Sequence, residues 1–130
     1  MDSGDIVMDE SAIWQDLGAE GINRLVAAFY RQVRLDDVLG PMYPQDDWEG
    51  AEHRLASFLR FRLGAETAYL EERGHPRLRM RHLPFRIGEA ERDRWLELMD
   101  KALAECEIAP ETREPLLAFF AQVADFMRNQ

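Results

Sequence analysis

The feature that most constrains this chain is a helical spacing of apolar residues that recurs along nearly its whole length. The clearest instance is a stripe over about three turns of one helical face, formed by Ile22, Leu25, Val26, Phe29, Tyr30 and Val33. Segments with the period-two alternation of a half-buried strand are almost absent, and none has a neighbour with which to pair. The pattern therefore predicts an all-α fold.

Similar spacing, together with helix start and stop signals, predicts the other helices. They run from Ser11 to Leu17, from a cap at Asp46 or Asp47 to about Leu63, from Glu66 to Glu72, from Glu89 to about Glu107, and from Pro110 onward. Gly18 is expected to stop the first helix. Gly64 is expected to take the left-handed position that follows a helix end. Pro115 lies inside the last helix and is expected to bend or delay it.

Two shorter stretches lie between the longer predicted helices. Asp36 to Leu39 is predicted to form one further turn, after which Gly40-Pro41 breaks the chain and residues 42–44 are extended, because Tyr43 precedes a proline. The run from Arg77 to His82 alternates like a strand but also fits one or two helical turns. Since no partner strand is in sight, a short helix that ends before Pro84 is favoured.

Length and charge narrow the class of protein. A chain of 130 residues has room for one domain, here residues 11–130 after a loose acidic lead-in at 1–10. No apolar run is long enough for a membrane span, the acidic start is unlike a secretory signal, and the single Cys106 excludes an internal disulfide. These features predict a cytoplasmic protein that does not bind membranes.

The net charge of −9 argues against a nucleic-acid partner, because phosphate binding needs a cationic face. Positive charge is nevertheless concentrated in one stretch, at Arg73, Arg77, Arg79, Arg81 and Arg86. Such a run is either a solvated surface or a local anion site. No phosphate-binding loop, dinucleotide fingerprint or nucleophile elbow is present.

The 3 histidines differ in their surroundings. His53 falls on the polar side of its helix, and His75 lies in a Gly-His-Pro turn. His82 is flanked by apolar residues, so it is either a core histidine or a ligand. A lone histidine does not make a zinc site, but it suffices for haem, where the macrocycle supplies the other four nitrogens.

Polar aromatic residues on apolar faces form the second candidate group: Tyr30, Tyr43 and Trp95. Each one alone is typical of a core aromatic that finds one hydrogen-bond partner. Together they raise the question of a shared acceptor.

The run YLEERGHPRLRMRHLPFRIGEAERDRW, residues 69–95, closely resembles the group II truncated haemoglobins. Phe29-Tyr30 and the segment MYPQDD around Tyr43 add to the resemblance, which covers roughly Ser11 to Met127. It implies a globin domain with a two-over-two helical sandwich that encloses haem b (iron protoporphyrin IX). One departure is that Gly18-Ala19 and Gly64-Ala65 stand where the family often has paired glycines.

The resemblance also implies roles for individual residues. It makes His82 the proximal iron ligand, with Tyr30, Tyr43 and Trp95 facing the bound gas. The apolar pocket would consist of Ala51, Leu55, Phe58, Leu78, Met80, Phe85 and Met99. The haem propionates would pair with Arg81 and Arg54, and more weakly with Arg79 and His75.

As a consequence, dioxygen or another diatomic ligand such as nitric oxide is expected to bind five-coordinate ferrous iron tightly and leave slowly, which suits sensing or redox chemistry better than bulk oxygen transport. The family also includes suggested nitric oxide dioxygenase and peroxidase activities, which would need an unidentified reductase. The sequence leaves open whether the protein forms a homodimer. The rival interpretation is a cofactor-free helical interaction module, which would use its arginine run for an acidic partner.

Overall fold

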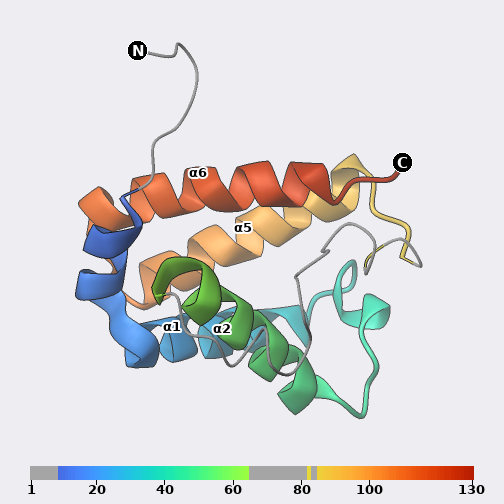
Figure 1. Cartoon of the computed structure of the whole chain (residues 1–130). Coiled ribbons are helices and arrows are strands. Elements are labelled where there is room, and N and C mark those ends of the chain that lie inside the picture. The colour runs from blue at the N-terminus through green and yellow to red at the C-terminus, as the bar shows by residue number, and fades with distance from the viewer. Residues whose placement is uncertain (1–8, 65–81, 83–84) are drawn as a thin grey trace.

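The computed structural model describes residues 9–64, 82 and 85–130, and over these ranges it contains helices but no strand. Its elements are α1 (Glu10–Val33), the short 3-10 helix η1 (Gly40–Met42), α2 (Trp48–Gly64), α5 (Glu89–Glu105) and α6 (Pro110–Phe126). Helix α1 packs on α2 and on α5, and α5 packs on α6. Figure 1 shows the α5–α6 pair lying over the α1–α2 pair. The all-α prediction is confirmed.

The buried stripe predicted for the second helix is confirmed within α1. Its six residues are all at most 5% exposed and form the centre of the core. The predicted stop at Gly18 is a sharp bend, with φ 62° and ψ −178° inside one long helix. Only glycine adopts this backbone conformation readily. Helix α1 begins at Glu10, one residue earlier than predicted, because the Asp9 carboxylate accepts a hydrogen bond from the Ala12 N–H at 3.1 Å.

The prediction of a left-handed Gly64 is wrong, since Gly18 alone among the described glycines has a positive φ. Gly64 is instead the last residue of α2, and the ring of Trp14 lies directly against it. A Cβ at this position would lie 2.5 Å from a ring carbon of Trp14. The glycine is therefore explained by the close approach of another helix, and not by its backbone angle.

The link between α1 and α2 is organised by Asp36. Its carboxylate accepts from the N–H groups of Val38 and Leu39 at 3.1 and 2.9 Å and pairs with Arg94 of α5 at 3.5 Å. Residues 37–39 form the predicted turn. Tyr43 is extended as predicted, with φ −105° and ψ 147°. Met42 belongs to η1 and is not extended, because Pro41 fits the start of a 3-10 turn.

Helix α5 ends at Glu105, two residues short of the predicted boundary. Glu107 adopts a left-handed φ of 56°, which lets the Ile108 N–H bond back to the Leu103 carbonyl at 3.2 Å. Helix α6 starts at Pro110 as predicted, so Pro115 does not delay it. Among the described helices none combines the length and hydropathy of a membrane span.

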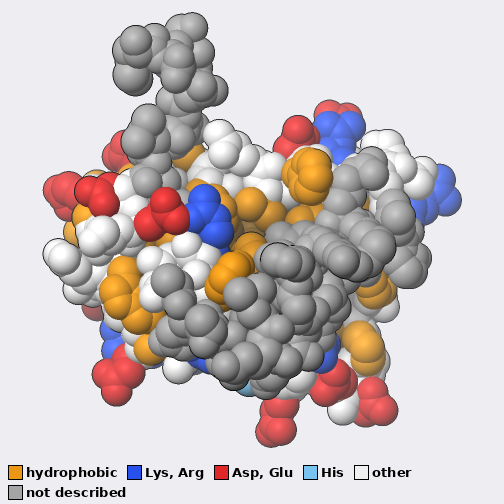
Figure 2. All heavy atoms as spheres, viewed as in Figure 1, with side chains coloured by type: hydrophobic (Ala, Val, Ile, Leu, Met, Phe, Trp, Pro, Cys, Tyr) orange, Lys and Arg blue, Asp and Glu red, His pale blue; other side chains and the backbone are white. Residues whose placement is uncertain are grey.

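The C-terminal residues hold the segment that follows His82. The Asn129 side chain donates to the Phe85 carbonyl at 2.7 Å and accepts from the Ile87 N–H at 2.9 Å. His82 itself is helical, and its carbonyl accepts from the Phe85 N–H at 2.9 Å. The helix predicted at Glu66–Glu72 and residues 77–81 of the helix predicted at Arg77–His82 lie outside the described residues. In Figure 2 acidic and basic side chains stand out around the edge of the molecule.

Candidate functional site

The three polar aromatic residues singled out in the sequence come together from three separate parts of the chain. Tyr30 lies in α1, Tyr43 follows η1, and Trp95 lies in α5. The rings of Tyr30 and Tyr43 meet edge to face, with centroids 5.5 Å apart and planes at 87°. Phe29 links Trp95 to the group, since its ring lies 4.9 Å from Trp95 and 5.1 Å from Tyr30. We call Tyr30, Tyr43 and Trp95 the polar aromatic cluster.

Burial differs among the three side chains of this cluster. Tyr30 is 5% exposed, whereas Tyr43 and Trp95 are half-buried. Burial raises the pKa of Tyr30 well above its ordinary value, and the neighbouring Tyr43 raises it further. Burial also raises the pKa of Tyr43, while hydrogen bonding with Tyr30 and Trp95 opposes this shift. Both side chains are therefore neutral hydroxyls at physiological pH.

The side chains of the cluster also hydrogen-bond one another. The contact between Tyr30 and Tyr43 raises the pKa of Tyr30 and lowers that of Tyr43. The contact with Trp95 also lowers the pKa of Tyr43. Because an indole N–H only donates, the Tyr43 oxygen accepts from Trp95.

Trp48 belongs to the same group of rings but was missed in the sequence. Its ring lies 5.4 Å from that of Tyr43, with planes at 31°, and 6.4 Å from that of Tyr30. Trp48 is the first residue of α2. The available signal was its helical spacing to Ala51 and Leu55, which places all three on one side of α2.

The predicted apolar wall is only partly within the described residues. Of its members, Ala51 and Phe58 of α2 are 4% and 9% exposed, Leu55 is half-buried against the core, and Met99 of α5 is fully buried. Phe85 is 40% exposed. Leu78 and Met80 lie outside the described residues.

The residues predicted to pair with the haem propionates also lie only partly within the described residues. Arg81, Arg79 and His75 lie outside the described residues. Arg54 bonds the Asp47 carboxylate at 3.2 Å, and its charge lowers the pKa of both Tyr30 and Tyr43. Arg54 therefore lies close enough to the polar aromatic cluster to act on it electrostatically.

His82 is half-buried, and its ring lies 6.2 Å from that of Phe85. His53 is exposed on α2, as predicted. Within the described ranges no group of three or more His, Cys, Asp and Glu residues is arranged to hold a metal ion. Cys106 is partly buried, and burial raises the pKa of its thiol.

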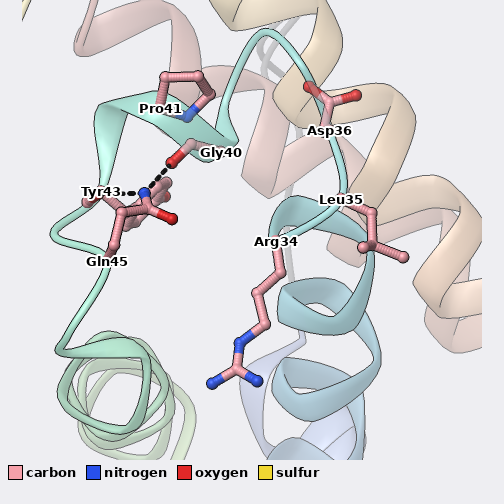
Figure 3. Close-up of a pocket in the computed structure, with 7 residues that line it drawn as sticks. All are labelled: Arg34, Leu35, Asp36, Gly40, Pro41, Tyr43 and Gln45. Atoms are coloured by element: carbon pink, nitrogen blue, oxygen red, sulfur yellow. Dashed lines mark hydrogen bonds between the residues drawn. The ribbon is translucent and has the colours of Figure 1, made fainter.

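A recess of about 450 Å³ opens on the surface beside the cluster. Its walls are Arg34, Leu35, Asp36, Gly40, Pro41, Tyr43 and Gln45. Figure 3 shows that these residues come from the end of α1 and from the loop that leads to α2. Tyr43 therefore belongs to both the polar aromatic cluster and the wall of a surface recess.

Comparison with known proteins identifies similar chains over almost the full length. Residues 12–129 match the model of a family described as bacterial-like globin. A group 2 truncated hemoglobin of Bacillus subtilis is 38% identical over 120 residues, which is 92% of this chain and 90% of that protein.

Solved structures agree with this match. A thermostable hemoglobin from the actinobacterium Thermobifida fusca has a TM-score of 0.85 and 42% identity, covering 90% of this chain and 96% of its own. A truncated haemoglobin from Bacillus subtilis, which is described as oxygen-avid, has a TM-score of 0.85 and 35% identity, with 90% and 98% of the two chains covered.

Proposed function

The chain is a group II truncated haemoglobin of the bacterial-like globin family, and from this premise we propose that His82 holds the iron of haem b while the polar aromatic cluster holds the gas. Globins of this family bind haem and small diatomic gases. The proposal concerns which residues of this chain do so, and how firmly the gas is retained.

The residues fit the cofactor on the side of the iron ligand. His82 is a partly buried imidazole with an aromatic neighbour, Phe85. Asn129 hydrogen-bonds the backbone at Phe85 and Ile87, which limits the movement of the segment next to His82. When bound, the haem would supply an iron atom that can hold one diatomic molecule.

The residues also fit on the side of the gas, and the observation that carries the proposal is the convergence of Tyr30, Tyr43 and Trp95 from three parts of the chain. Each side chain carries one hydrogen that it can donate to a ligand. A ligand that enters competes for these hydrogens with the bonds that the three side chains make to one another.

Because Tyr30 is buried, a hydrogen bond that it donates is protected from water and strengthened. A hydrogen bond to a charged or strongly polarised acceptor contributes about 1.5–3 kcal/mol. One such bond slows the release of dioxygen by roughly 10–100-fold. The truncated haemoglobin from Bacillus subtilis, 35% identical to this chain, is described as oxygen-avid. We therefore infer tight oxygen binding with slow release, suited to sensing or redox chemistry.

The first test is the visible spectrum of the purified ferrous protein. His82→Ala should abolish the five-coordinate imidazole spectrum. His53→Ala removes a histidine that is exposed on α2 and serves as the matched control, so it should leave the spectrum unchanged. An unaltered ferrous spectrum in His82→Ala would disprove the assignment.

The second test is the dissociation rate of oxygen, measured by stopped flow. Trp95→Phe and Tyr30→Phe should each raise this rate by roughly 10-fold or more. Both would donate to the same bound dioxygen, so the double variant should deviate from the product of the single effects. Strict additivity would mean that the two side chains do not share an acceptor.

A further inference from the structure

The first residue of α2 holds the ring of Tyr43 on one side. The centroids of the Trp48 and Tyr43 rings lie 5.4 Å apart with their planes at 31°, which is a tilted contact. Tyr30 meets Tyr43 at 87° with centroids 5.5 Å apart. Tyr43 is therefore fixed by one tilted contact and one edge contact, made by residues from different helices.

The guanidinium of Arg34 adds a charge to this arrangement. Arg34 is the residue that directly follows α1, and its Cζ lies 5.4 Å from the centroid of the Trp48 ring. A cation at this distance is attracted by the electrons of the indole. In Figure 3 the Arg34 side chain extends from the end of α1 toward the start of α2. Arg34 and Trp48 thus link the two helices across the loop that carries Tyr43.

We propose that the Arg34–Trp48 pair positions the Tyr43 hydroxyl for the bound gas, which makes Trp48 a positioning residue and Arg34 the charge that holds it. The proposal rests on the function proposed above, because it assumes that Tyr43 faces the gas. It adds two residues that neither the sequence patterns nor the resemblance had indicated.

The surroundings of Tyr43 explain why its ring needs this support. The residue lies outside any helix, in extended backbone between η1 and α2. Gln45 fixes that backbone, because its amide donates to the carbonyls of Gly40 and Tyr43 at 3.0 and 2.8 Å. These bonds hold the main chain but leave the ring free to turn about its side-chain torsions.

The recess lies beside Tyr43, which forms part of the wall of this space of about 450 Å³. Protein interiors are normally packed without gaps, and packing is what restricts the rotation of a side chain. On the side of the recess Tyr43 is less tightly packed, so its contacts with Trp48 and Tyr30 contribute more to its restraint.

The test combines two measurements on haem-loaded protein. The first is the ¹⁹F spectrum of protein labelled with 3-fluorotyrosine, in which Tyr43→Phe identifies the Tyr43 resonance. The second is the dissociation rate of oxygen. The variants are Trp48→Leu, Trp48→Phe, Arg34→Gln and Arg34→Lys. Arg31→Gln is the matched control, since Arg31 is an exposed arginine of the same last turn that pairs with Glu105 and not with Trp48.

Trp48→Leu should broaden or shift the Tyr43 resonance and raise the oxygen dissociation rate by about 2–10-fold, as expected for the loss of one aromatic contact. Arg34→Gln should raise the rate by about 2–5-fold. Trp48→Phe and Arg34→Lys should restore values close to those of the original protein. Arg31→Gln should change neither measurement.

The decisive experiment places Trp48→Leu in a Tyr43→Phe background, where it should give no further increase in the rate. An equal increase in that background, or an unchanged Tyr43 resonance in both Trp48→Leu and Arg34→Gln, overturns the proposal. If Trp48→Leu does not fold, the Arg34→Gln variant still tests the proposal, because Arg34 is exposed. An unchanged Tyr43 resonance in that variant then overturns the proposal. Failure of the proposed function would appear separately, as protein without a haem spectrum, and the ¹⁹F measurement would still report on the ring.

Discussion

The two buried tyrosines predict a specific loss of stability in alkaline solution. Tyrosine is neutral when protonated, and burial raises the pKa of both Tyr30 and Tyr43 above the ordinary value of 10.0. In the unfolded chain both side chains ionise near that value. Their contribution to stability is therefore fully present below pH 10 and is lost as the pH rises toward the folded-state pKa values.

The size of the loss follows from linkage. While a tyrosine stays protonated in the folded protein and ionised in the unfolded chain, each pH unit lowers the free energy of unfolding by about 1.4 kcal/mol. For Tyr30 and Tyr43 together the loss between pH 10 and 11 reaches up to about 2.8 kcal/mol. Tyr30, with the larger shift, should retain its proton further into the alkaline range than Tyr43.

The assay is urea unfolding of haem-loaded protein, followed by circular dichroism at pH 9, 10 and 11. The original protein should lose more stability over this range than the Tyr30→Phe/Tyr43→Phe variant. The other titratable side chains are the same in both proteins, so their contributions cancel in the comparison. Equal pH dependence in the two proteins would refute the reasoning, because it would mean that these hydroxyls ionise in the folded state as easily as in water.

Two further predictions concern the backbone. Gly64→Ala should lower the free energy of unfolding by about 1–3 kcal/mol, because its Cβ would lie 2.5 Å from the Trp14 ring. Chemical denaturation measures this loss. If the clash is its cause, the loss should be smaller in a Trp14→Leu background. Glu107→Gly should raise the free energy of unfolding by up to about 1 kcal/mol, because Glu107 has a φ of 56°. Glu107→Ala removes the same carboxylate but keeps the Cβ, so a gain of equal size in that variant would show that charge and not backbone strain is responsible.

The helices were predictable because their information is local. The stripe of apolar residues in α1 has to be buried, and Pro110 has a backbone angle and a missing N–H that suit the start of a helix. Gly64 was misjudged because its reason is not local. A glycine near a helix end is typical of a left-handed cap, and nothing in the neighbouring residues shows that Trp14, in another segment, lies on it.

The site was less accessible to pattern reasoning. Tyr30, Tyr43 and Trp95 each look like ordinary core aromatics, and only the family resemblance indicated that they face one ligand. Their meeting depends on how α1, α5 and the loop after η1 pack in space, which spacing along the chain does not encode. Trp48 follows Asp47, so the sequence marks it only as the start of a helix. Its contact with Tyr43 is made by tertiary packing.

The bend at Gly18 matters for anyone who modifies the start of this protein. It turns the first part of α1 so that residues there serve two helices distant in sequence: Trp14 lies against Gly64 of α2, and the Asp16 carboxylate accepts from the Thr112 hydroxyl of α6 at 2.7 Å. Affinity tags and fluorescent fusions should therefore be joined ahead of Asp9. A fusion point within the next turns would disturb both of these contacts, even though it lies far from His82 in the sequence.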